Sequence, residues 1–306
     1  MTMRVAGFGL SEPVSSSFGK GSAFFIGPRT TEFAALFRVM AGSCLITNLN
    51  SEFPIEPKEN YFFSDFRENT DQDLLFLNDF EESLTLKDYE DHVSGKGFAN
   101  RKFYKSLLAE LCGAVFNEGI DNHTAAFVHL YRAYEHLSYA FPMIYAAKTD
   151  NYIGTFENLR KWISSSDNDG NVGELRFHKA FVSTLFKDLP ELSSTIDIHI
   201  QSRDEYKEAI FEGLASKVLG WKRPEQYTGA TTRPDKLSIS FSEFHSFIVN
   251  LRNRYFHYSN SRSDNIVLEE IVESDLLFSF VNKAGMNYIT TIFNGVVGHQ
   301  MEARLI

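Results

Sequence analysis

Three long stretches of the chain carry apolar side chains at the spacing of an amphipathic α-helix, and they restrict the possible folds most. A stripe that recurs about every 3.6 residues gives a helix one face to bury against other helices. We therefore predict a helical bundle, with Pro142 ending the first of these helices. The stripes consist of Phe127, Leu130, Tyr131, Tyr134, Leu137, Ser138 and Phe141; Phe241, Phe244, Phe247, Ile248 and Leu251; and Leu276, Leu277, Phe280, Ala284, Tyr288, Ile289 and Ile292.

The rest of the chain shows shorter patterns. Gly, Ser and Phe are frequent in 1–30, which favours short strands and loops, and 43–49 is typical of a strand. Residues 31–49 otherwise show no clean period. Helical patterns recur at 71–90, 101–116, 175–186 and 204–219, and polar loops are expected at 164–171 and 220–235.

The predicted fold class follows from these patterns. It is mainly α, with a smaller mixed α+β region at 1–104 and a helical bundle at 105–306. A helical insertion at about 164–235 interrupts the bundle. The 306 residues are 43% hydrophobic and include 29 Phe, which is ample for a packed core.

Composition also indicates the compartment. We expect no membrane span, because the sequence holds no run of 18 apolar residues, and no secretory signal in the first ten residues. Cys44 and Cys112 have no motif spacing and are typical of buried, reduced thiols. The expected location is therefore the cytoplasm.

Most of the net charge of −10 belongs to one segment. Residues 51–100 hold 13 acidic and 4 basic residues, which leaves the remainder nearly neutral. A solvated acidic surface is the simplest interpretation. Alternatively, the segment covers a basic patch formed by Arg252, Arg254 and Arg262, or recruits a basic partner.

The last turn of the 241–254 helix carries the residues with the clearest chemistry. A guanidinium at Arg252 can hold a phosphate in two-pronged fashion, and His257 can transfer protons near neutral pH. Asn253 could contact a phosphate oxygen or orient the imidazole. At 100° per residue, Arg252 and His257 lie about 140° apart and converge only if the helix unwinds near Tyr255. The structural alternative is that Arg252 pairs with an acidic residue while His257 caps the helix.

This arrangement resembles the HEPN superfamily, helical bundles in which an Arg-x4–6-His motif forms a metal-independent ribonuclease. The resemblance covers 105–165 and 236–300. It implies that Arg252, Asn253 and His257 are catalytic and that the protein cleaves RNA without a cofactor. It also implies a homodimer with a shared cleft, and a role as an antiviral defence or toxin–antitoxin effector, released by a regulatory protein or a phage-derived trigger.

Three further residues are candidates for support of this site. Glu135, on the first bundle helix, could orient Arg252 or His257. Arg254 would add charge, and Tyr258 could stack on a base. The alternative function is a non-catalytic helical module that binds a nucleotide or a protein through the same cleft.

Other motifs give weaker signals. His123, His129 and His136 lack the spacing and companion ligands of a zinc site. The glycines near residues 7–9 and 19–22 lack the spacing of a phosphate-binding loop. The sequence thus favours the HEPN-like site over a metal or nucleotide site.

Overall fold

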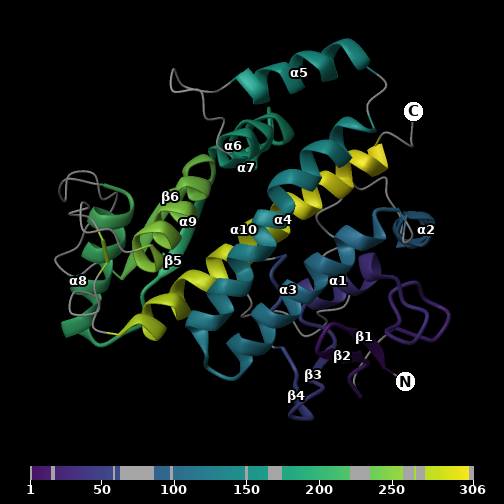
Figure 1. Cartoon of the computed structure of the whole chain (residues 1–306), viewed down its shortest axis with the longest axis horizontal. Helices are drawn as coiled ribbons and strands as arrows, with labels where there is room; N and C mark the ends of the chain where they lie inside the picture. The colour runs from purple at the N-terminus through teal and green to yellow at the C-terminus, as the bar shows by residue number, and fades with distance from the viewer. Residues whose placement is uncertain are drawn as a thin grey trace. The chain divides into compact units, whose positions relative to one another are not determined.

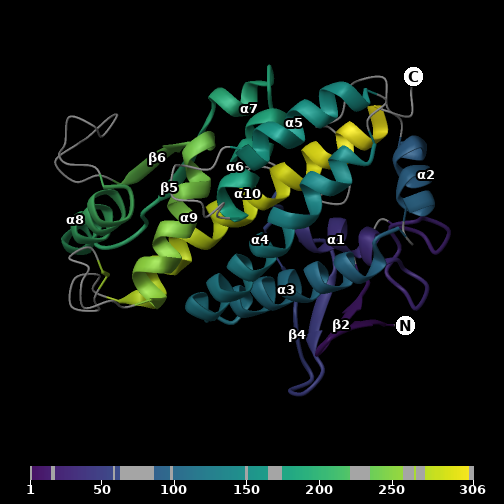
Figure 2. The same ribbon diagram turned by 45° about the horizontal axis from the view of Figure 1, so that its top comes forward.

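The structure is a computed structural model, mainly helical with a small antiparallel sheet near the N-terminus, as the sequence predicts (Figures 1 and 2). It describes 2–14, 18–57, 59–62, 86–96, 99–148, 151–164, 174–220, 235–257, 265–266 and 273–302. Contacts divide the chain into two compact units, described separately below. Unit 1 comprises Met1–Thr155 with Ile289–Ile306, and unit 2 comprises Phe156–Tyr288. The predicted division of the chain into domains at 1–104 and 105–306 stays a prediction.

The sheet of unit 1 has the order β1-β2-β3-β4 and is antiparallel throughout. Its strands are β1 (Met3–Val5), β2 (Phe8–Ser11), β3 (Leu45–Asn48) and β4 (Phe53–Ile55). The register pairs Met3 with Leu10, Leu10 with Ile46 and Ile46 with Ile55, and all four are buried. One apolar row therefore crosses the sheet, because side chains on paired positions share a face. The strand expected at 43–49 is confirmed.

Helix α1 (Glu32–Met40) lies in the region where the sequence showed no clean period. All nine of its residues are buried, including Glu32 and Arg38. Seven of its nine residues are apolar, and the segment is too short to show the repeated stripe of the longer helices. Thr31 begins the helix, and its side chain accepts a hydrogen bond from the Ala34 amide at 3.2 Å.

Helices α3 (Arg101–Gly119) and α4 (His123–Ala146) pack along each other in unit 1, and α3 also packs on α1. The helix predicted at 101–116 and the stripe of α4 are confirmed, since every member of that stripe is buried. The prediction that Pro142 ends this helix is wrong, because α4 continues to Ala146. Burial of Phe141 and Ile144 on either side offsets the backbone hydrogen bond that proline cannot make.

The C-terminal part of α10 (Ser274–Glu302) completes the core of unit 1. The Phe293 ring lies 5.0 Å from Phe37, 5.7 Å from Phe33 and 5.9 Å from Phe141, measured between ring centroids. Aromatic packing of this kind accounts for part of the high phenylalanine content. Unit 1 also holds α2 (Leu86–Lys96), and most of the helix predicted at 71–90 falls outside the described residues.

Unit 2 consists mainly of helices with one small hairpin. Its elements are α5 (Tyr152–Ser164, which begins in unit 1), α6 (Glu174–Leu185), α7 (Pro190–Ser193), β5 (Thr195–His199), α8 (Asp204–Glu212), the π-helix η2 (Gly213–Val218), β6 (Lys236–Ser240), α9 (Phe241–Phe256) and the first half of α10. The helices predicted at 175–186 and 204–219 are confirmed, the second with a π-helical end.

The antiparallel pair β5–β6 is the feature of unit 2 that the sequence did not predict. Thr195 pairs with Ser240, and His199 pairs with Lys236. Ile198, Leu237 and Ile239 are buried. The two strands are five residues each and are separated by α8 and η2. No short hairpin turn joins them, so the sequence has no turn motif that would indicate their pairing. β6 runs directly into α9 and thereby fixes where that helix begins.

The stripes predicted for α9 and α10 are confirmed. In α9 all five predicted members are buried. In α10 the predicted Leu277, Ala284, Tyr288, Ile289 and Ile292 are buried, whereas Leu276 and Phe280 are half-buried. Among the described residues, none of the helices is both long and apolar enough to cross a bilayer.

Candidate functional site

The sequence-predicted site lies at the C-terminal end of α9 in unit 2. Buried Phe244, Phe247 and Leu251 fix the rotation of this helix against its neighbours. That rotation leaves Arg252 and Asn253 half-buried in its last turns. The Arg252 Nη1 atom donates a hydrogen bond to the Asn253 Oδ1 atom at 2.9 Å. The structure thus brings the first two predicted residues into direct contact.

The helix does not unwind near Tyr255, because α9 stays helical to Phe256. His257 follows as the C-cap with φ −113° and ψ 75°, and its side chain is exposed. Aromatic packing explains the intact turn, since the Phe278 ring of α10 lies 4.9 Å from Tyr255 and 6.1 Å from Phe256. Local unwinding of α9 therefore does not bring Arg252 and His257 of one copy together.

The three supporting candidates lie in different places. Glu135 is half-buried on α4 of unit 1, whereas Arg252 belongs to unit 2. Arg254 is half-buried, and its carbonyl oxygen accepts a hydrogen bond from the Ile266 amide at 3.0 Å, which ties Ile266 to the end of α9. Tyr258 lies outside the described residues, as does Arg262. The supporting roles of Glu135, Arg254 and Tyr258 stay predictions.

A second polar cluster joins α3 to α4 and was missed from the sequence. The Glu110 carboxylate lies 2.8 Å from the His129 Nδ1 atom and 2.9 Å from the Arg132 Nη2 atom. An ionised carboxylate accepts hydrogen bonds but cannot donate them, so the proton of this contact resides on Nδ1. The contact needs a small residue at Gly113, where an added Cβ would lie 2.7 Å from His129 Nδ1.

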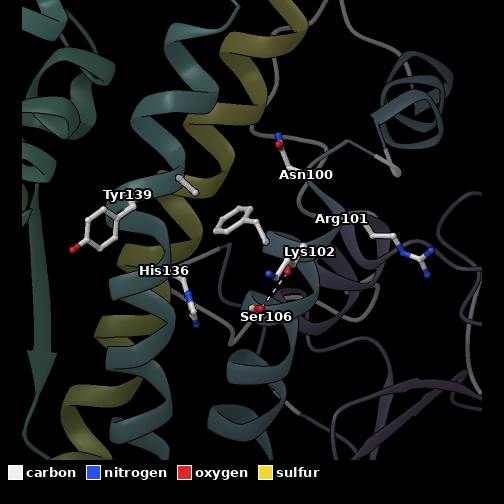
Figure 3. Close-up of a pocket in the computed structure, with 8 residues that line it drawn as sticks. Asn100, Arg101, Lys102, Ser106, His136 and Tyr139 are labelled. Atoms are coloured by element: carbon white, nitrogen blue, oxygen red, sulfur yellow. Dashed lines mark hydrogen bonds between the residues drawn. The ribbon is translucent and has the colours of Figure 1, made fainter.

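A shallow pocket of about 640 Å³ lies between the start of α3 and the middle of α4 (Figure 3). Its lining includes Lys102 and Ser106 from α3 and His136 and Tyr139 from α4. The Ser106 hydroxyl donates to the Lys102 carbonyl at 3.1 Å. The i, i+3, i+7 spacing of His129, Arg132 and His136 is the sequence signal that could have pointed to this surface.

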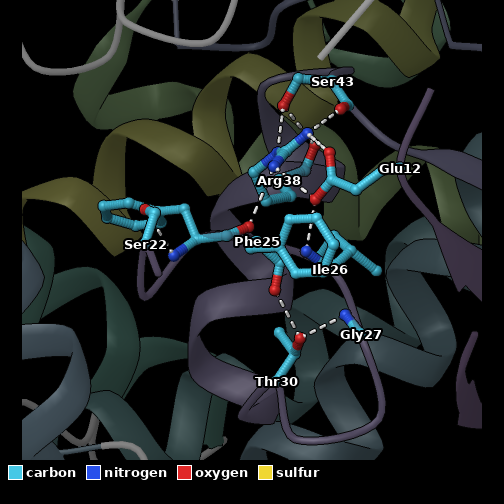
Figure 4. Close-up of polar contacts among 9 residues, drawn as sticks. Glu12, Ser22, Phe25, Ile26, Gly27, Thr30, Arg38 and Ser43 are labelled. Carbon is cyan, nitrogen blue, oxygen red and sulfur yellow. Dashed lines mark hydrogen bonds and ion pairs between the residues drawn. The ribbon is translucent and has the colours of Figure 1, made fainter. Parts of the chain in front are cut away.

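The polar cluster around Arg38 is structural (Figure 4). The fully buried Arg38 guanidinium forms an ion pair with Glu12 at 3.0 Å and donates to the Ser43 hydroxyl at 2.8 Å and the Phe24 carbonyl at 2.9 Å. Glu12 also accepts from the Ile26 amide. These contacts hold the chain before α1 against the helix, because each buried donor requires an acceptor.

A larger cavity of about 950 Å³ adjoins the Arg38 cluster. Glu12, Ser22, Arg29 and Thr30 are among its lining residues. Ser22 and Glu12 are engaged within the fold, the first with Glu90 at 2.5 Å and the second with Arg38. These two polar side chains therefore stabilise the fold.

Two histidines of unit 2 are unsuited to proton transfer. Burial first, and then the neighbouring His245, hold the pKa of His178 well below its usual range. Burial, with Lys179 as the second cause, lowers the pKa of His245 to about 4. Their rings lie 5.8 Å apart, and both are neutral near pH 7. They belong to the core of unit 2.

In the described parts of the chain, no three His, Cys, Asp or Glu side chains gather closely enough to hold a metal ion. Cys44 and Cys112 are buried thiols, and burial raises the pKa of Cys112, with the neighbouring Cys44 as the second cause.

No protein-family model, curated protein or solved structure matches this chain.

Proposed function

We propose that the protein is a metal-independent endoribonuclease of HEPN type that uses Arg252, Asn253 and His257. The observation that carries the proposal is the end of α9. In this helix the Arg252 Nη1 atom lies 2.9 Å from the Asn253 Oδ1 atom, and an exposed His257 follows directly after the last turn. A positioned guanidinium can stabilise charge on the phosphate, and an accessible imidazole can act as the base, in phosphodiester cleavage without a metal.

The mechanism assigns one step to each group. The neutral imidazole of His257 takes the proton of the ribose 2′-hydroxyl, and the 2′-oxygen attacks the adjacent phosphorus. The bond from phosphorus to the 5′-oxygen breaks, and that oxygen takes a proton from an acid. Arg252 stabilises the charge on the pentavalent phosphate. The products are a 2′,3′-cyclic phosphate and a 5′-hydroxyl.

A homodimer would supply the acid as well as the base. Because α9 remains helical to Phe256, Arg252 and His257 of one copy do not converge by local unwinding. A two-fold axis would bring two copies of each residue to one cleft, where a second His257 could serve as the acid. Glu135, Arg254 and Tyr258 are the proposed supporting residues.

The biological setting follows from the HEPN resemblance alone. We propose a cytoplasmic defence or toxin effector that a regulatory protein or a phage-derived trigger activates. The acidic segment 51–100 would restrain the cleft or bind a basic partner. Its residues 63–85 lie outside the described residues, so this role rests on charge.

The direct test is cleavage of a labelled RNA in excess EDTA. Wild-type protein should cleave, whereas His257→Ala should lose the activity by at least about 100-fold, the scale of a lost general base. His199→Ala is a matched control, since it removes another exposed histidine of unit 2 and should leave the rate unchanged. Circular dichroism checks the fold of both variants. Full cleavage by His257→Ala would refute the assignment.

The alternative is a non-catalytic module that binds a nucleotide or a protein with the same residues. The intact turn of α9 favours it, because Arg252 and Asn253 then form one polar contact surface apart from His257. In that case the nucleotide or protein binds and RNA is not cut. Arg252→Ala would weaken binding, while His257→Ala would leave binding unchanged.

A further inference from the structure

One face of the α3–α4 pair gathers groups that recognise phosphate and bases. Four residues of α4, His129, Arg132, His136 and Tyr139, fall within an arc of about 80° at 100° per residue. They extend along roughly 15 Å of the helix, given its rise of 1.5 Å per residue. Lys102 and Ser106 of α3 line the same pocket as His136 and Tyr139. We call these six residues the α3–α4 surface.

The charges of this surface favour an anion. Residues 101–109 of α3 include Lys102 and Lys105 and no acidic residue, and Arg101 in the same stretch forms an ion pair with Glu32 at 3.0 Å. Glu110 is 9% exposed and contacts both His129 and Arg132, so its charge is largely balanced. Glu135, which is half-buried, is the other acidic residue next to the α4 positions. Arg132 and Glu110 offset each other's charge, so the positive charge of this face comes from Lys102 and Lys105, within a protein whose net charge is −10.

The donors on this surface are held in place and remain accessible. The Arg132 side chain is 58% exposed although it contacts Glu110, and a guanidinium has five N–H donors, of which that contact uses few. Glu110 fixes the His129 ring through Nδ1, so that a protonated ring would donate through Nε2. Figure 3 shows His136 and Ser106 between the two helices and Tyr139 directed away from α3. Tyr139 is 46% exposed.

We propose that the α3–α4 surface binds single-stranded nucleic acid, with phosphates at Lys102, Arg132 and His136 and a base stacked on Tyr139. Cations along a groove with an exposed aromatic ring at its edge are the elements of sequence-tolerant single-strand binding. That the strand is RNA rests on the proposed function, in which the surface holds substrate outside the α9 site. The surface lies entirely within unit 1, on two helices that pack on each other.

The test measures binding without cleavage. A labelled oligonucleotide of 2′-deoxy sugars lacks the nucleophile for transesterification, so the full wild-type chain can be titrated by fluorescence anisotropy. The double variant Lys102→Gln/Tyr139→Ser changes two exposed residues and should weaken binding about tenfold or more. The slope of log affinity against log salt should fall by about 0.7 for the lost phosphate contact.

The matched control is Lys187→Gln/Tyr152→Ser, which removes one exposed lysine and one exposed tyrosine that lie on neither α3 nor α4 and should bind within about twofold of wild type. Two results would overturn the proposal: unchanged affinity in Lys102→Gln/Tyr139→Ser, or equally tight binding of a blunt duplex or inorganic tripolyphosphate. Cleavage that survives in His257→Ala would refute the nuclease assignment and leave this binding result standing.

Discussion

At the scale of single residues, the chain uses arginine for two different purposes. Arg38 is fully buried, and its partners Glu12, Ser43 and Phe24 come from the segments around α1. Arg252 is half-buried and is hydrogen-bonded to Asn253, and an exposed His257 follows five residues later. The sequence alone does not separate these roles, because the distinction depends on burial and partners.

The structural role of Arg38 leads to a stability prediction. Arg38→Met should lower the free energy of unfolding by about 3–5 kcal/mol, since Glu12 and two carbonyl groups would lose a buried partner. Arg29→Gln removes an equal charge at an exposed position and should change stability by about 0.5 kcal/mol or less. Urea unfolding monitored by circular dichroism compares the two. Equal stability in both variants would contradict the role given to Arg38.

At the scale of helices and strands, the outcome of sequence prediction depended on how each element is buried. The stripes of α4 and α9 were predictable because each helix keeps a polar face. Helix α1 was missed because it is short and seven of its nine residues are apolar. The β5–β6 pair depends on contacts across α8, and the Glu110–His129 contact depends on how α3 and α4 align. Neither contact can be predicted from the sequence pattern of a single segment.

Two glycines within helices should respond to alanine in opposite directions. Gly298→Ala in α10 meets no atom within 4 Å and should stabilise the protein by about 0.5–1 kcal/mol through the better helix propensity of alanine. Gly113→Ala in α3 would place a Cβ 2.7 Å from His129 Nδ1. It should destabilise by about 1–2 kcal/mol through loss of the Glu110 contact. If urea unfolding shows equal stabilisation in both, the close approach at Gly113 is not a constraint.

At the scale of the whole molecule, the proposed nuclease needs two copies. Arg252→Ala and His257→Ala should each be inactive alone. A shared cleft that needs one His257 as base and the second as acid works only in a dimer of two intact copies. Equimolar co-expression of wild type with His257→Ala should then leave about a quarter of wild-type activity, because about a quarter of the dimers hold two intact copies. About half of wild-type activity, or a monomer by light scattering, would contradict a shared site.

The chemistry of the RNA ends tests the central claim most directly. Mass spectrometry of the fragments of a short RNA, cut in excess EDTA, reports which bond was broken and where the oxygen atoms remain. Attack by the 2′-oxygen, with His257 as base and Arg252 on the phosphate, predicts a 2′,3′-cyclic phosphate on one fragment and a 5′-hydroxyl on the next. Fragments with 5′-phosphate and 3′-hydroxyl ends, or no cleavage once EDTA is added, would contradict it.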